Sequence, residues 1–224
     1  MSNLDMSNAV VSNSGAASPT VSELTASNPK LIADLTAVIA GRGLLRLQEP
    51  VRLASGAMSQ DFIDIKRALC EWEALRLACQ VIAEGVEAAG ISFDAAGGMT
   101  MGADPLAVGI AAVCGSGWFS VRKTPKARGT NKLIEGTPLG VGQRVLLLED
   151  TTTTGGSALR ALEVVRKTGA EVVAFATVVN RGDSAQRSFS EAGVAFFAAL
   201  TYEHLGIDPV VPPDVPGSGA GPLA

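Results

Sequence analysis

The spacing of apolar residues changes several times along the chain. A capping Asn and a Pro precede apolar residues at helical spacing, which predicts a helix over 28–41 that Gly41 ends. Short strand-like runs over 44–65 surround a turn at 54–56. A single apolar stripe at helical spacing then predicts one long helix over 66–89.

The second half of the chain carries the clearest indication of fold class. Val145–Leu148 is a continuous apolar run, typical of a strand buried on both faces of a parallel sheet. A helical pattern over 157–168 and a second apolar run over 172–179 complete a strand–loop–helix–strand unit. The predicted class is therefore α/β with a mostly parallel central sheet flanked by helices, and a ligand is expected at the loop 149–157.

Composition sets the limits of the folded unit. Residues 1–27 are rich in Ser, Asn, Ala and Thr, which predicts a disordered leader, and the five prolines of 209–224 predict an irregular Pro/Gly-rich tail. One domain over 28–208 is expected in this chain of 224 residues. The start of the chain lacks a basic-then-apolar order, so a cytoplasmic location is the expectation.

Charge and apolar content argue against two kinds of partner. The formal net charge is −4, so neither a nucleic acid nor a membrane is expected as a partner. The longest apolar stretch without charge, 105–121, is shorter than the roughly 20 residues of a membrane span and is interrupted by glycines.

Few residues of the metal-binding or redox types are present. His204 is the only histidine, which makes a zinc enzyme or a Ser-His-Asp hydrolase a weak hypothesis. The three cysteines form no CxxC pair, and we expect the thiols of Cys70, Cys79 and Cys114 to be buried.

The loop Glu149–Ser157 combines two acids, four threonines, two glycines and a serine at a strand-to-helix turn. Glycines allow backbone N–H groups to approach an anion, and the start of the helix contributes its positive dipole end. This is a phosphate cradle without the lysine of a Walker loop. The two acids suit sugar hydroxyls or a divalent cation, so a phosphorylated sugar satisfies both halves.

A second group of residues is strongly cationic. Five of the 18 Lys and Arg residues lie within Arg122–Lys132, and that segment contains no acid. We expect a mobile loop whose partner is a compact anion such as pyrophosphate. A solvated turn with chance clustering of bases is the simpler alternative.

The acids and the Thr- and Gly-rich turn resemble the phosphoribosyl pyrophosphate signature of the type I phosphoribosyltransferases. The resemblance implies that family's fold, with a small hood subdomain. It places the ribose and the 5-phosphate of that substrate on Glu149, Asp150, Thr151, Thr153, Thr154, Gly155, Gly156 and Ser157.

The cationic segment, followed by Leu-Ile-Glu-Gly, resembles the catalytic loop of the orotate phosphoribosyltransferases. That resemblance implies a homodimer whose loop reaches the partner's site, with Lys126 and Asp150 as catalytic residues. It assigns pyrophosphate to Arg122, Lys123, Lys126 and Arg128, and orotate to Thr153 and Arg181. It also implies Mg²⁺ carried by the substrate, with no metal ligand among the side chains of the protein.

This sequence departs from the family pattern at four positions. Ala54 and Gly102 stand where several members carry lysine, and Gly102 lies in a segment, 97–105, that resembles the family's pyrophosphate-binding turn. Arg128 stands for a histidine, and Asn180 replaces the Asp before Arg181. Two alternatives to the orotate enzyme stay open. One is a phosphoribosyltransferase for another base, and the other is a non-catalytic nucleotide-sensing or RNA-binding regulator on the same fold.

Overall fold

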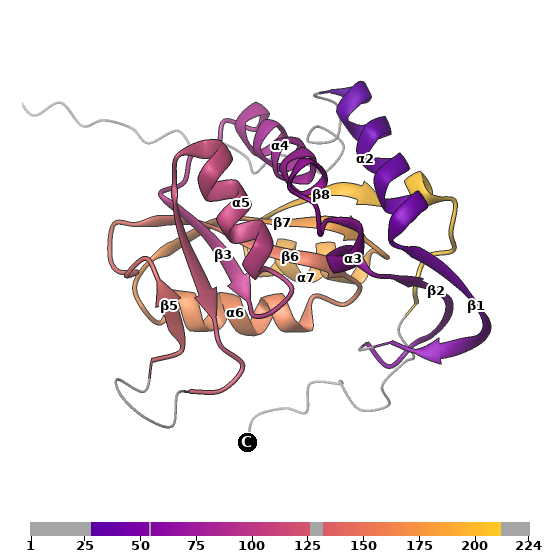
Figure 1. Cartoon of the computed structure of the whole chain (residues 1–224). Helices are drawn as coiled ribbons and strands as arrows, with labels where there is room; N and C mark the ends of the chain where they lie inside the picture. Colours follow the sequence, from indigo (N-terminus) through magenta and orange to yellow (C-terminus); the bar gives the residue numbers. More distant parts are fainter. Residues whose placement is uncertain (1–27, 54, 126–131, 212–224) are drawn as a thin grey trace, which may run out of the picture.

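The computed structural model describes residues 28–53, 55–125 and 132–211. Their main feature is a six-stranded sheet of order β5-β4-β3-β6-β7-β8, in which every neighbouring pair is parallel except β4 and β5 (Figure 1). The strands are β3 (Ala95–Met99), β4 (Gly117–Val121), β5 (Ile134–Gly136), β6 (Arg144–Thr152), β7 (Glu171–Asn180) and β8 (Ala195–Thr201). This confirms the predicted α/β class.

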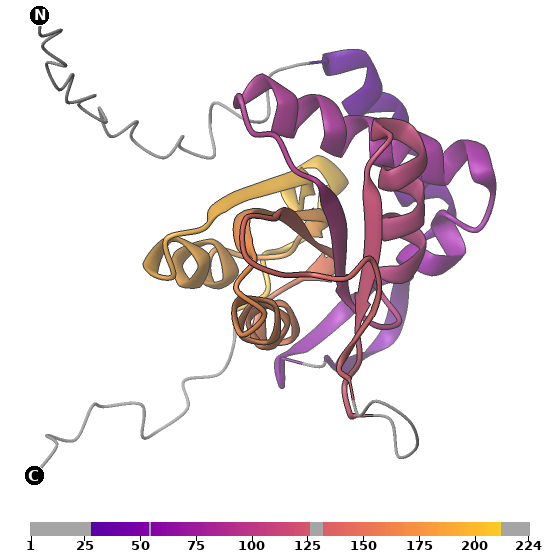
Figure 2. The ribbon, with the colours of Figure 1, turned by 90° about the vertical axis from the view of Figure 1, so that its left-hand side faces the viewer.

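Helices cover both faces of this sheet, as the view in Figure 2 shows. One face carries α2 (Pro29–Arg42), α4 (Trp72–Ala88) and α5 (Asp104–Cys114), and the other carries α6 (Gly156–Arg166) and α7 (Ser184–Glu191). Successive residues of β6 explain the two layers. Val145 and Leu147 pack into the core under α6, whereas Leu146 and Leu148 pack into the core under α4 and α5. The apolar run is therefore buried on both sides, as a central parallel strand requires.

A separate two-stranded antiparallel sheet forms the hood. It consists of β1 (Leu44–Arg52) and β2 (Met58–Ile63), which lie on either side of the predicted turn. The short helix α3 (Ile65–Ala68) follows β2 directly and returns the chain toward the main sheet. A 3₁₀ turn, η1 (Glu203–Leu205), follows β8.

The prediction of one continuous helix over 66–89 was wrong. Asp64 caps α3 by accepting a hydrogen bond from the Arg67 N–H at 3.0 Å, and α3 ends after one turn. Glu71, in an extended conformation, then starts α4. The break allows Ile65 and Ala68 to be buried in the same core as the apolar residues of α2. No Gly or Pro in the sequence marks the position of the break.

The expectation of buried thiols was right for one cysteine of the three. Cys79 is fully buried in α4, at the point where Gly109 of α5 comes so close that a Cβ there would lie 2.5 Å from the Cys79 sulfur. Cys70 lies in the break between α3 and α4, and Cys114 lies at the end of α5; both are exposed. The burial of each thiol therefore depends on where its residue lies in the fold and not on the residue type.

Candidate active site

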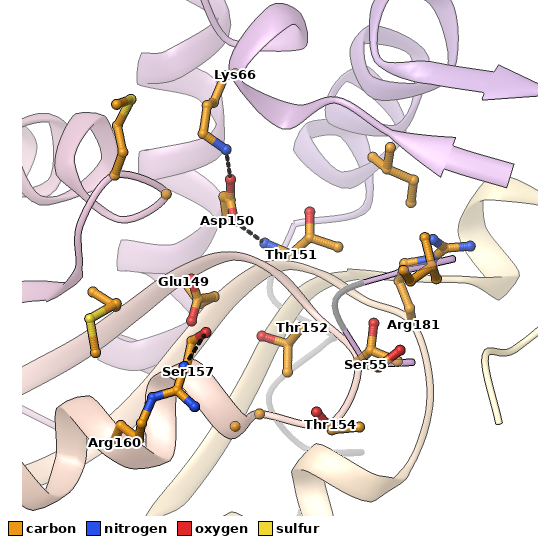
Figure 3. A pocket seen from close by; sticks show the side chains of 18 of the residues that line it. Ser55, Lys66, Glu149, Asp150, Thr151, Thr152, Thr154, Ser157, Arg160 and Arg181 are labelled. Carbon is orange, nitrogen blue, oxygen red and sulfur yellow. Dashed lines mark hydrogen bonds and ion pairs between the residues drawn. The ribbon is translucent and has the colours of Figure 1, made fainter. Parts of the chain in front are cut away.

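A cavity of about 870 Å³ opens at the carboxyl ends of the parallel strands (Figure 3). Its walls are the segments that follow four neighbouring strands: Met99–Gly102 after β3, Lys123 after β4, Glu149–Ser157 at the end of β6, and Arg181 after β7. The hood and α3 close the other side with Leu53, Ser55, Phe62, Ile63 and Lys66, and Arg160 of α6 completes the lining. This is where ligands bind in open parallel sheets.

The turn from β6 into α6 has the geometry of an anion site. Gly155 has φ of +77°, a conformation that favours glycine, and its α-carbon faces Ala185 and Phe189 of α7, where a Cβ would lie 3.3–3.4 Å away. No side chain of the described residues caps the start of α6, so the first N–H groups of that helix are available to a ligand. The Thr151 hydroxyl is buried without a hydrogen-bond partner among the described residues. A phosphate group suits these donors.

The two acids at the end of β6 have different environments. Asp150 accepts a hydrogen bond from Lys66 Nζ at 2.6 Å through one carboxylate oxygen and from the Thr151 N–H at 2.8 Å through the other. Glu149 makes no hydrogen bond to any described side chain; burial, followed by the charge of Asp150, raises its pKa to about 8. The pair therefore offers one fixed carboxylate and one that is protonated over much of the neutral range.

The turn Met99–Gly102 is anchored by Asp104, the first residue of α5. Its carboxylate accepts hydrogen bonds from the Thr100 hydroxyl at 2.6 Å and from the Ser120 hydroxyl of β4 at 2.7 Å. Gly102 lies directly against Asp150, since a Cβ at position 102 would be 2.8 Å from Asp150 Oδ1. The turn and the acids therefore form one continuous wall of the cavity.

Arg181 supplies a buried cation at the hood side of the cavity (Figure 3). Its side chain is 2% exposed, and Nη2 donates a hydrogen bond to Ser59 Oγ at 3.2 Å. Burial lowers the pKa of Arg181, while the charge of Asp61, itself paired with Arg46, raises it. Nε has no hydrogen-bond partner among the described residues, so the guanidinium keeps a donor for a ligand.

The structure brings most of the residues singled out in the sequence to this one cavity. Glu149, Asp150, Thr151, Thr153, Thr154, Gly155, Gly156, Ser157, Lys123 and Arg181 all line it. Arg122 does not, because it is directed at Glu135 of β5, with 3.6 Å between Arg122 Nη1 and Glu135 Oε1. Lys126 and Arg128 lie outside the described residues.

Sequence reasoning missed three side chains that contribute to this site. Lys66 and Arg160 add charge to the lining, and Ser59 holds Arg181. Arg160 donates to Ser157 Oγ at 3.3 Å from the next turn of α6. Its position three residues after the phosphate turn was a readable signal, whereas the position of Lys66 depends on the break between α3 and α4.

No helix in the ranges given above is long and apolar enough to cross a membrane. The same ranges contain no group of three or more His, Cys, Asp or Glu side chains that could hold a metal ion.

Residues 74–196 match the model of the phosphoribosyl transferase domain. The chain is 43% identical over 164 residues to an orotate phosphoribosyltransferase of Streptomyces coelicolor, covering 70% of this chain and 88% of the relative. It is 40% identical over 153 residues to one of Thermococcus gammatolerans, covering 68% and 80%.

Solved structures give the same result. The orotate phosphoribosyltransferase of Mycobacterium tuberculosis H37Rv, crystallised with 5-phospho-α-D-ribosyl 1-diphosphate, superposes with a TM-score of 0.66 at 35% identity, covering 79% of this chain and 99% of that one. Sequence, fold and cavity thus agree, and the chain belongs to the orotate phosphoribosyltransferase family of type I phosphoribosyltransferases.

Proposed function

We propose that this protein transfers the phosphoribosyl group of phosphoribosyl pyrophosphate to orotate, giving orotidine 5′-monophosphate and pyrophosphate in pyrimidine biosynthesis. One observation carries the proposal. A single cavity joins an uncapped helix start, two adjacent acids and a buried arginine with a free donor. These groups match, in that order, the phosphate, the ribose and a carboxylated base.

The phosphosugar lies along the turn between β6 and α6 in this proposal. The 5-phosphate accepts hydrogen bonds from the N–H groups of Gly155, Gly156 and Ser157. It also accepts hydrogen bonds from the hydroxyls of Thr151, Thr153 and Thr154. The ribose hydroxyls donate to Glu149 and Asp150. Arg160, whose guanidinium reaches Ser157, adds positive charge beside the phosphate.

Pyrophosphate departs on the opposite side of the ribose, beside the turn Met99–Gly102. Lys123 lines that region, and Arg122, Lys126 and Arg128 belong to the same cationic segment, which we propose closes over the substrate. Mg²⁺ would be carried by the pyrophosphate and the ribose hydroxyls of the substrate, whose hard oxygens it prefers. The ion would neutralise charge on the leaving pyrophosphate.

Orotate lies at the hood end of the cavity in this proposal. Its carboxylate accepts hydrogen bonds from Arg181, and Thr153 lies nearby in the lining. The base already carries its nucleophilic nitrogen, so the protein aligns that nitrogen with the anomeric carbon and stabilises the departing anion. Closure by the cationic segment also excludes water, which would hydrolyse the activated sugar.

Several broader features belong to the same proposal. The enzyme acts in the cytoplasm as a homodimer in which Lys126 of one subunit serves the site of the other. Residues 28–208 form the phosphoribosyltransferase domain. Neither a nucleic acid nor a membrane takes part.

Arg181 distinguishes this proposal from transfer to another base. A buried guanidinium whose Nε has no partner in the described part of the chain disfavours a neutral base, because a base without a carboxylate would leave that donor unused. A non-catalytic regulator would have no need of the five cations between Arg122 and Lys132.

The test is an assay of base specificity. The purified protein is mixed with Mg²⁺, phosphoribosyl pyrophosphate and one base at a time: orotate, uracil, adenine or hypoxanthine. We expect loss of orotate absorbance that requires the phosphosugar, and no reaction with the other bases. Consumption of a purine would support transfer to another base, and phosphosugar binding without any base consumed would support the regulator.

A further inference from the structure

Lys66 occupies a position that the proposed reaction leaves without an assigned role. It lies in α3, the one-turn helix after the hood, and its side chain reaches the end of β6, 84 residues away in the sequence. Nζ is 2.6 Å from Asp150 Oδ2, and the side chain lines the cavity while remaining 52% exposed. Figure 3 shows the ammonium directed at the Asp150 carboxylate from above the cavity.

The Lys66 ammonium and the turn Met99–Gly102 meet at the Asp150 carboxylate. Gly102 and Lys66 both approach the same carboxylate, because a Cβ on Gly102 would be 2.8 Å from Asp150 Oδ1 and 3.1 Å from Oδ2. The ammonium is therefore at the junction of the ribose acids and the turn beside which pyrophosphate leaves. A lysine at position 102 would require Asp150 to move from the place where Lys66 holds it.

The negative charge gathered in this part of the cavity favours a further cation. Glu149 and Asp150 are close to the path of an anionic diphosphate, whereas Arg160 and Arg181 lie at the phosphate and base ends. Apart from Lys66, Lys123 is the remaining cation among the described residues of the lining. Burial alone would lower the pKa of Lys66, but the hydrogen bond and charge of Asp150, together with Asp64 and Glu149, raise it, so the ammonium stays charged.

We propose that Lys66 is a pyrophosphate-binding residue, and that it provides the fixed positive charge which Gly102 leaves out of the adjoining turn. Without substrate, Lys66 holds Asp150 in place. When the phosphosugar binds, the ammonium donates to the diphosphate and Asp150 accepts from the ribose hydroxyls. The inference rests on the proposed function, since it assigns a residue to one portion of that substrate.

The test measures binding of two separate ligands by calorimetry, without turnover. The first is inorganic pyrophosphate with Mg²⁺, and the second is ribose 5-phosphate, which lacks the diphosphate. The variants are Lys66→Ala, Lys66→Arg and, as a matched control, Lys30→Ala, which also removes a lysine paired with an aspartate but lies in α2 outside the cavity lining.

We expect Lys66→Ala to weaken pyrophosphate binding roughly tenfold to a hundredfold, the usual effect of a lost charged hydrogen bond. Binding of ribose 5-phosphate should weaken by no more than about fivefold, because Asp150 keeps the Thr151 N–H and an exposed ion pair contributes little. Lys66→Arg should retain most of the pyrophosphate affinity, and Lys30→Ala should match the wild type.

A second comparison separates direct binding from an effect through Asp150. Lys66→Ala is combined with Asp150→Asn, and the loss of pyrophosphate affinity is measured against Asp150→Asn alone. A direct contact predicts that the loss persists. Two results would overturn the assignment and leave the proposed function standing. One is that Lys66→Ala no longer weakens pyrophosphate binding in the Asp150→Asn background, and the other is that the single variant Lys66→Ala loses equal affinity for both ligands. Failure of the wild type to bind either ligand would overturn both.

Discussion

The guanidinium of Arg181 donates a hydrogen bond to the hydroxyl of Ser59 at 3.2 Å, which joins the end of β7 to the hood across 122 positions of sequence. The Arg181 main chain is held as well, because its N–H donates to the Thr152 carbonyl at 2.8 Å and its carbonyl accepts from the Val210 N–H at 2.7 Å. Asn180 donates no side-chain hydrogen bond to Arg181, so Ser59 takes the orienting role.

Ser59→Ala should therefore impair recognition of the base selectively. Loss of the hydroxyl leaves the guanidinium less well oriented, and we expect KM for orotate to rise about tenfold while KM for phosphoribosyl pyrophosphate changes little. Steady-state kinetics with each substrate varied in turn measures both values. Ser188→Ala, which removes a hydroxyl from α7 outside the cavity lining, is the control. Equal changes in the two KM values would contradict the role given to Ser59.

Glu149 makes ligand binding depend on pH. Since burial raises its pKa to about 8, the acid is protonated in the free protein at neutral pH and ionised at about pH 9. A carboxylate accepts hydrogen bonds from ribose hydroxyls more strongly than a carboxylic acid does. We expect affinity for ribose 5-phosphate to increase from about pH 7 to about pH 9 in the wild type and to stay flat in Glu149→Gln. A rise of equal size in the variant would contradict this assignment.

The same residue affects folding stability with the opposite trend. Between the usual pKa of 4.5 and about 8, the folded protein holds a proton on Glu149 that the unfolded chain releases. The free energy of unfolding contributed by this group therefore falls as pH rises through that window. Glu149→Gln should be more stable than the wild type at about pH 9 and similar to it near pH 5. Denaturant unfolding of both proteins at the two pH values measures this, and equal stabilities at about pH 9 would contradict it.

Two glycine substitutions should change stability in opposite directions. A Cβ on Gly97 of β3 would lie 2.0 Å from the Phe119 carbonyl oxygen of β4, so Gly97→Ala forces the strands apart and should cost more than about 3 kcal/mol. A Cβ on Gly41 of α2 would meet no atom of another described segment within 4 Å, and Gly41→Ala should stabilise the fold by up to about 1 kcal/mol. Chemical denaturation measures both. A tolerated Gly97→Ala would show that the strands do not require this close approach.

Lys126, outside the described residues, is proposed to act in the partner's site. Lys126→Ala should lower kcat far more than affinity for phosphoribosyl pyrophosphate, because the residue stabilises the departing anion. Mixing Lys126→Ala with Asp150→Asn should then restore up to about a quarter of wild-type activity, since each mixed dimer contains one complete site. If every mixture stays as inactive as its components, the loop acts within its own subunit.

The sequence allowed most of the site to be predicted, because its central part is contiguous. Val145–Leu148 identified the buried strand, and Glu149–Ser157 followed it in one turn, so strand, loop and helix could be placed without distant contacts. Arg181 could be placed because it follows the neighbouring strand directly.

The remaining parts of the site depend on long-range packing. Lys66 reaches Asp150 because the expected long helix breaks at 69–71, and that break reflects burial of Ile65 and Ala68 and not a local breaker residue. The Ser59 contact requires the hood to fold against the end of β7. Arg122 lies outside the cavity lining, with its side chain directed at Glu135, and charge composition alone does not report such a direction.

The central claim is tested most directly by the stoichiometry of the products. With Mg²⁺, phosphoribosyl pyrophosphate and limiting orotate, we predict one orotidine 5′-monophosphate and one pyrophosphate for each orotate consumed, measured by chromatography of the reaction mixture. Pyrophosphate released without orotidine 5′-monophosphate, or a full set of reactants left unchanged, would contradict the account.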